Sequence, residues 1–315
     1  MLMKLPYKDQ HMTTTRQIMQ TAYSLGLSIP AFNVAHIPMT EPIIRALVDT
    51  DSFSLVEVSR VDCEKFGAKS IRDVYEEYAE HENPAHARLH LDHVPVIDED
   101  QKLVDYLAVI KEALSLGYQS VMIDGSRLSL DENIRITREV VDLVGNPEIP
   151  VEAELGAVLG HESGPLPPYE ELYTTGKGFT KVNEASRFVT ESGCSWLSVA
   201  IGSIHGAVSD ALKSQKKPTA RLNLDHLQKL KEATGIPLVL HGVSGVDQSY
   251  VNQAGKFGIS KINVGTEIRQ AYETEIQKSG SVVKAQDAVY DRVADLVKNY
   301  YCIRGIRKLV LPAES

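Results

Sequence analysis

Cysteine is scarce in this sequence. The three cysteines, Cys63, Cys194 and Cys302, are far apart and odd in number. None of them stands at motif spacing from a histidine or from another cysteine. A disulfide framework needs paired cysteines and an oxidising compartment. We therefore expect a cytoplasmic protein with unpaired thiols.

Long apolar runs and excess positive charge are also missing. No run is long enough to cross a bilayer, and the opening MLMKLPYKDQ lacks the apolar core of a signal peptide. The net charge of −9 argues against nucleic acid or an anionic membrane surface as the main partner. Hydrophobic residues make up 43% of the 315 residues, as in ordinary globular proteins. We expect neither a nucleic-acid partner nor a membrane partner.

What the sequence does contain is a regular alternation of short apolar runs and segments with helical spacing. Eight runs are typical of buried parallel strands: Ala31–Val34, Ser54–Ser59, Ala87–Leu91, Ser120–Ile123, Val151–Leu155, Trp196–Ile201, Leu238–Leu240 and Lys261–Val264. Helical spacing occupies the segments between them: Met39–Asp49, Asp100–Leu116, Leu130–Val144, Asn183–Ser192, Leu224–Ala233 and Val246–Phe257.

Strict strand–helix alternation over eight units predicts an α/β fold, the (β/α)8 TIM barrel. An open doubly wound sheet is the alternative, but such sheets usually carry a glycine-rich turn after the first strand, and FNVAHIP has no glycine. We expect a single barrel domain spanning residues 1–315. A long loop from Gly156 to Thr180 should follow the fifth strand, and an extra helix over Val282–Tyr301 should pack outside the barrel.

Three histidines stand where predicted strands end. His93 ends the third strand, His205 follows the sixth and His241 ends the seventh. The carboxyl ends of barrel strands share one face, and three imidazoles meeting there are a typical catalytic zinc arrangement. A single histidine is more often a hydrogen-bonded residue than a ligand, but three on one face favour a metal. We expect His90 to point away from the face used by Asp92.

Carboxylates accompany these histidines. Asp92 precedes His93 and suits either proton transfer to a substrate oxygen or the orientation of an imidazole. Three others come from the fourth and fifth strands and could stabilise cations or accept internal hydrogen bonds: Asp124, Glu152 and Glu154. The long loop carries Glu162, where a base could close over substrate.

Small and polar residues follow the last two strands. Gly242, Ser244 and Gly245 come directly after His241, and backbone N–H groups in such a turn can bind an anion. The last strand contains Asn263 and leads into Gly265 and Thr266. This edge of the barrel therefore combines a phosphate site with a metal ligand and an amide.

Six motifs resemble, in order, the strand-end motifs of the class II, metal-dependent fructose-bisphosphate and tagatose-bisphosphate aldolases. They are LHLDH, SVMIDGS, VEAELG, VAIGSIHG, PLVLHGVSG and KINVGTE. The resemblance runs from about Ala31 to the region of Arg269. It implies a barrel with zinc bound by three histidines. It also implies cleavage of a ketose phosphate into dihydroxyacetone phosphate and an aldehyde, through the enediolate of dihydroxyacetone phosphate.

The resemblance assigns roles residue by residue. His93, His205 and His241 match the zinc ligands, Asp92 the proton donor to the aldehyde oxygen, and Glu162 the base that removes the C3 proton of dihydroxyacetone phosphate. Asp124 and Glu154 match ligands of an alternate or second zinc position. The substrate-binding positions are Gly206, Gly242, Ser244, Asn263, Gly265 and Thr266. Sodium or potassium near the phosphate, and a homodimer or homotetramer, are also implied.

The departures from the family pattern concern the far end of the substrate. Gly265 replaces a larger residue, and Arg60 and Arg127 stand at two earlier strand exits where smaller residues or histidine are common. Their guanidinium groups suit a second anion, or they are surface residues paired with an acid such as Asp62 or Asp131. The substrate is then a ketose bisphosphate or a sulfonated analogue such as sulfofructose 1-phosphate. A zinc-dependent barrel hydrolase and a non-catalytic sugar-phosphate-binding protein are the other interpretations.

Overall fold

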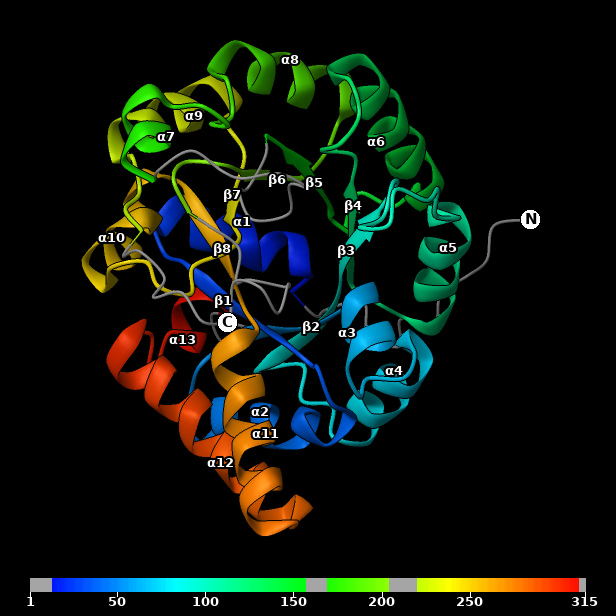
Figure 1. Cartoon of the computed structure of the whole chain (residues 1–315), viewed down its shortest axis with the longest axis vertical. Coiled ribbons are helices and arrows are strands. Elements are labelled where there is room, and N and C mark those ends of the chain that lie inside the picture. Colours follow the sequence, from blue (N-terminus) through cyan, green and yellow to red (C-terminus); the bar gives the residue numbers. More distant parts are fainter. Residues whose placement is uncertain (1–12, 157–168, 204–219, 312–315) are drawn as a thin grey trace.

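The structure is a computed structural model that describes residues 13–156, 169–203 and 220–311. Eight parallel strands form a closed barrel in which each strand pairs with the next and the last pairs with the first (Figure 1). The strands are β1 Ile29–Asn33, β2 Ser54–Ser59, β3 Ala87–Pro95, β4 Ser120–Asp124, β5 Val151–Leu155, β6 Trp196–Val199, β7 Leu238–Leu240 and β8 Ile259–Val264. The predicted (β/α)8 barrel is confirmed.

Helices alternate with the strands and surround them. They are α1 Thr15–Leu25, α2 Thr40–Asp49, α3 Arg60–Lys65, α4 Ile71–Glu80, α5 Tyr106–Leu116, α6 Leu130–Val144, α7 Tyr169–Thr175, α8 Val182–Ser192, α9 Leu224–Thr234, α10 Gln248–Ala254, α11 Thr266–Ser279, α12 Val282–Asp295 and α13 Arg307–Val310. Local sequence explains their limits, as in α6. That helix begins with a capping box between Ser129 and Glu132 and ends at Gly145, which adopts a left-handed conformation.

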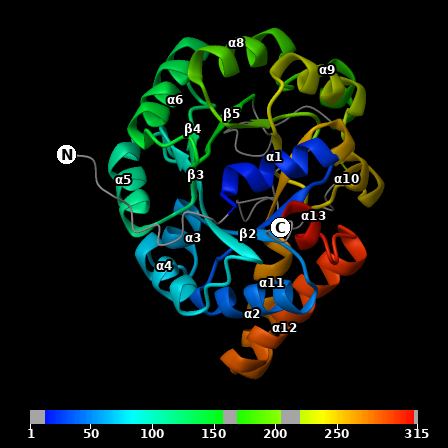
Figure 2. The same cartoon turned by 180° about the vertical axis from the view of Figure 1, so that it is seen from behind.

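The elements outside the eight repeats agree in part with expectation. The predicted C-terminal helix is confirmed as α12, which packs against α2 and α11 and continues into a π-helical turn over Leu296–Tyr300. Helix α1 ends just before β1 and lies across the end of the barrel where the strands begin, next to α13 (Figure 2). Of the predicted loop after β5, residues 157–168 lie outside the described residues, and the remainder includes the short helix α7.

Strand β3 differs from expectation. It runs to Pro95, so His93 lies inside the strand rather than at its end. The register with β4 shifts between Leu91 and Val94, and His93 has a φ of +37°. Such a bulge breaks the alternation of side chains, which lets consecutive residues of β3 reach the barrel mouth. Before the bulge the alternation holds.

The expectation that His90 points away from Asp92 is wrong. His90 and Asp92 are two residues apart on the regular part of the strand, so their side chains share one face. Both side chains lie in the buried interior of the barrel. That interior is unusually polar. Its fully buried side chains include those of Glu57, Glu152 and Lys261, which are expensive to bury unless they pair with one another.

Candidate active site

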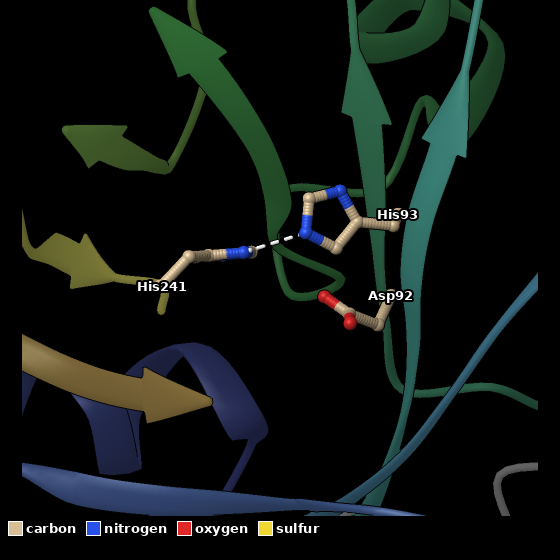
Figure 3. A group of neighbouring side chains, drawn as sticks. All are labelled: Asp92, His93 and His241. Carbon is tan, nitrogen blue, oxygen red and sulfur yellow. Dashed lines mark hydrogen bonds between the residues drawn. The ribbon is translucent and has the colours of Figure 1, made fainter. Parts of the chain in front are cut away.

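Asp92, His93 and His241 meet at the carboxyl end of the barrel. Asp92 and His93 belong to β3, and His241 follows β7, which lies across the barrel from β3. Figure 3 shows the two imidazoles facing each other with the Asp92 carboxylate beside them. His241 Nδ1 lies 2.7 Å from His93 Nε2, and the rings are perpendicular with centroids 4.5 Å apart. Each of the three residues offers a ligand atom within 4.8 Å of the others. The bulge in β3 makes this possible because it brings Asp92 and His93 to the same space.

The protonation of the two histidines follows from their partners. Glu152 Oε1 lies 2.9 Å from His241 Nε2, and a carboxylate can only accept, so Nε2 carries the proton and Nδ1 is the acceptor that faces His93 Nε2. Burial and the neighbouring His93 lower the pKa of His241. Although burial opposes it, the carboxylates of Asp92 and Asp124 raise the pKa of His93 well above its ordinary value. The site therefore favours positive charge at His93.

A second group of ligands shares His93. Asp124 Oδ2 lies 3.6 Å from His93 Nδ1, and Asp124, Glu154 and His93 also bring ligand atoms within 4.8 Å of one another. Glu154 is buried, and its Oε2 has no hydrogen-bond partner in the part of the chain that the structure describes. Burial, and then Asp124, raise the pKa of Glu154 well above its ordinary value. A buried carboxylate oxygen of this kind fits a divalent cation as its partner.

The structure therefore brings together four of the five residues for which we expected a metal role: His93, His241, Asp124 and Glu154. The fifth, His205, lies outside the described residues, as do Gly206 and the expected base Glu162. Imidazole nitrogens with carboxylate oxygens are ligands that zinc accepts in catalytic sites. The donor set that is described fits the expected metal.

Two side-chain amides hold Asp92. Asn263 Nδ2 donates to Oδ1 at 2.9 Å and Asn33 Nδ2 donates to Oδ2 at 3.2 Å. Burial opposes ionisation of Asp92, yet the positive charges of His93 and Lys261 hold its pKa below its ordinary value. The carboxylate is thus ionised, buried and fixed in orientation. Asn33 was not among the predicted site residues, although a polar residue at the end of a buried strand is a signal that could have identified it.

Apart from Gly206, the expected phosphate-binding residues lie at the exits of β7 and β8. Gly242 follows His241 with a φ of +69°, a conformation that glycine adopts without strain. Thr266 is the first residue of α11, whose 14 residues direct the positive end of the helix dipole to this edge. A Cβ at Gly265 would stand 3.3 Å from Asn33 Oδ1. The small residue therefore makes room for the amide that holds Asp92.

Arg60 and Arg127 meet at the loop after β3. The Arg60 guanidinium contacts Asp98 at 3.1 Å and also pairs with Glu64 and Glu99. Arg127 Nη1 donates to the backbone oxygen of Asp98 at 2.6 Å. The acidic partners of Arg60 therefore differ from the expected Asp62 and Asp131, since Asp62 caps α3 and Asp131 pairs with Arg187.

Comparison with known proteins identifies the family of this chain. The model of the family "Fructose-bisphosphate aldolase class-II" matches residues 13–305. A fructose-bisphosphate aldolase of Streptococcus pneumoniae is 31% identical over 96% of this chain and 95% of its own length. One from Streptococcus pyogenes is 29% identical over 88% of this chain and 87% of its own length.

Solved structures give the same result. The YdjI aldolase of Escherichia coli K12 superposes with a TM-score of 0.70 at 25% identity, covering 92% of this chain and 97% of its own. A putative fructose-1,6-bisphosphate aldolase from Coccidioides immitis has a TM-score of 0.70 at 26% identity, with 92% and 96% covered. The chain therefore belongs to the class II fructose-bisphosphate aldolase family and is an aldolase, a lyase that acts on a carbon–carbon bond.

Proposed function

We propose that this aldolase reversibly cleaves a ketose 1-phosphate or ketose bisphosphate into dihydroxyacetone phosphate and an aldehyde, with zinc as its cofactor. The observation that carries the proposal is the buried, ionised Asp92, held by Asn33 and Asn263 beside the paired His93 and His241. The default substrate is fructose-bisphosphate, which the names of the relatives support, or tagatose-bisphosphate.

His93, His205 and His241 would hold the zinc ion, with Asp124 and Glu154 as ligands of an alternate position. Bound there, zinc supplies a Lewis acid that stabilises negative charge as it develops on the substrate oxygens. The protein's residues move the protons. In cleavage, Asp92 accepts the hydroxyl proton of the carbon that becomes the aldehyde, and in synthesis it returns that proton. Glu162 exchanges the C3 proton of dihydroxyacetone phosphate.

Substrate orientation follows from the two ends of the site. Gly206, Gly242, Ser244, Gly265 and Thr266 would hold the phosphate, with sodium or potassium nearby, and Asn263 would contact the substrate hydroxyls. The other end of the substrate would then extend towards the loop after β3, where Arg60 and Arg127 lie. An anion at that end, a phosphate or a sulfonate, is the substrate class these arginines favour.

We also propose that the enzyme is a cytoplasmic homodimer or homotetramer. The cysteines of the described residues are unpaired, as expected in a reducing compartment. No helix in the described part of the chain has both the length and the apolar character that a membrane crossing requires.

The decisive experiment is a screen of ketose phosphates for release of dihydroxyacetone phosphate, with and without a chelator. We expect cleavage by the untreated protein, its loss after chelation, and recovery with zinc or cobalt. Full activity of the metal-free protein would contradict the metal role. Release of inorganic phosphate without an aldehyde would instead indicate a hydrolase.

A further inference from the structure

Lys261 is a fully buried lysine in the middle of β8, directly beneath the site. Its Nζ donates a hydrogen bond to Asn263 Oδ1 at 2.8 Å and forms ion pairs with Glu152 Oε2 at 2.9 Å and Glu57 Oε2 at 3.1 Å. Asp92 Oδ1 lies 3.7 Å away. A lysine is almost never buried so completely without such partners. The cluster places one ammonium at the centre of four polar side chains.

Two of these contacts lead directly to the reacting groups. Because Lys261 donates to Oδ1 of Asn263, the amide must turn its Nδ2 towards Asp92, where it donates at 2.9 Å. On the other side, Lys261 pairs with one oxygen of Glu152, and the other oxygen accepts from His241 Nε2 at 2.9 Å. This last contact leaves the Nδ1 lone pair of His241 turned towards His93. Lys261 therefore reaches the general base Asp92 through Asn263, in addition to the direct ion pair at 3.7 Å, and reaches the expected metal ligand His241 through Glu152.

An alternative role for an active-site lysine is attack on a ketone to form an imine, which requires a neutral amine. The surroundings of Lys261 oppose it. Burial alone lowers the pKa of Lys261, but the carboxylates of Glu152 and Glu57 outweigh burial and raise that pKa above its ordinary value. The amine stays protonated and is held by Asn263, Glu152 and Glu57, so the lysine acts as a fixed cation.

We propose that Lys261 is a positioning residue that orients Asp92 through Asn263 and His241 through Glu152. The effect on Asp92 rests on the proposed aldolase function. The effect on His241 concerns metal affinity alone. Outer partners of this kind typically change metal affinity or activity by about 10–100-fold when they are removed.

The test replaces the ammonium while keeping the charge of the interior balanced. Lys261→Met alone leaves Glu57 and Glu152 without their cation, so the main variant is the double substitution Lys261→Met with Glu57→Gln. Glu57→Gln alone is the matched control, because the ion pair of Glu57 with Lys261 reaches neither Asn263 nor His241. Folding is checked by circular dichroism and thermal unfolding. Zinc affinity is measured by chelator competition, and kcat and KM are measured at saturating zinc.

We expect the control to stay within about threefold of the wild type in every constant. Relative to that control, the double variant should bind zinc about 10–100-fold more weakly and lose about 10–100-fold in kcat with little change in KM. The cobalt-substituted double variant should also show a shifted visible spectrum. A fall in melting temperature with unchanged kcat and zinc affinity would overturn the proposal, and so would a double variant that fails to fold. Absence of cleavage by the wild type would refute the proposed function, while the zinc measurement would still test Lys261.

Discussion

At the scale of single residues, the site depends on an aspartate that is buried, ionised and hydrogen-bonded at both carboxylate oxygens. Asn33 and Asn263 each donate to one oxygen of Asp92, so the carboxylate is fixed in one orientation. Burial raises the energy of the charge, which the neighbouring His93 and Lys261 offset. An ionised carboxylate in this setting is suited to take a proton in the cleavage direction.

Separate steps should fail when the two acid–base residues are removed. Asp92→Ala should block carbon–carbon cleavage and leave C3 proton exchange of dihydroxyacetone phosphate partly intact, while Glu162→Ala should suppress that exchange. Each loss should be about 10²–10⁴-fold, the usual contribution of a general acid or base. Cleavage is measured by product release and exchange by loss of deuterium label. Equal loss of the same step in both variants would refute this division of labour.

Residues of this kind also mark how far sequence alone can predict a site. His93, His241 and Asp92 were predictable because several histidines and a carboxylate stand at the exits of strands that share one face of a barrel, whereas a single histidine is more often only hydrogen-bonded. Lys261 and Glu152 stand inside strands, and their partners come from β2, β3 and β8. Which buried charges pair depends on the register of strands distant in sequence, and no local pattern contains that information.

At the scale of elements, strand β3 and the loop after it determine the shape of the mouth. The length of β3 was underestimated because residues 92–95 include charged and proline positions that end most strands. The bulge at Leu91–Val94 keeps the strand going and moves both Asp92 and His93 inward. The conformation of the following loop is fixed by hydrogen bonds. Asp98 accepts them from the backbone N–H groups of Asp100 and Lys102 and from the Arg60 side chain.

This loop is where we expect discrimination between substrates. Arg60→Ala and Arg127→Ala should raise KM for a ketose bisphosphate more than for a ketose 1-phosphate with an uncharged far end. The larger change should come from Arg127, whose charge has no carboxylate partner among the residues described, whereas Arg60 already has three. Loss of one charged hydrogen bond costs about 1.5–3 kcal/mol, roughly 10–100-fold in KM.

The matched control for the loop is Arg72→Ala, which removes an exposed arginine paired with Glu112 on the outer helices and should leave both KM values unchanged. If Arg60→Ala and Arg127→Ala raise the two KM values equally, these arginines serve only to hold the loop.

At the scale of the whole molecule, the two ends of the described chain meet on the side opposite the mouth. Helix α13 packs beside α1, and Arg307 and Lys308 pair with Asp51, in the turn between α2 and β2, at 2.6 and 3.0 Å. The eightfold alternation was readable from sequence because every strand–helix unit repeats the same apolar pattern. This closure was not, because it consists of partly exposed ion pairs and of backbone hydrogen bonds from Gly305 to Thr50 and from Arg307 to Asp51, between segments that are distant in sequence.

The closure should make stability depend on pH. Side-chain hydrogen bonds from Arg307 and Lys308 lower the pKa of Asp51 in the folded state. Its stabilising contribution is therefore present above the ordinary aspartate pKa of about 3.9 and is lost as the pH falls through the lowered pKa. The difference in free energy of unfolding between the wild type and Asp51→Asn, measured in urea, should shrink from pH 7 to pH 3.

High salt should reduce the same difference at pH 7, because the pairs are partly open to solvent and salt screens them. The control, Asp100→Asn, removes an exposed carboxylate 3.7 Å from Lys102 and should show little dependence on pH. A wild-type advantage over Asp51→Asn that persists at pH 3 would show that charge is not the cause.

The anchoring of the loop after β3 has a practical consequence for enzyme engineering. Arg60 and Arg127 hold it from the rim, while the buried cluster around Lys261 lies below, inside the barrel. Libraries that vary residues 97–103 together with these two arginines would therefore sample new aldehyde acceptors without changing the residues that we propose as acid–base groups. Random substitutions in β5 or β8 would more often produce inactive or unfolded clones.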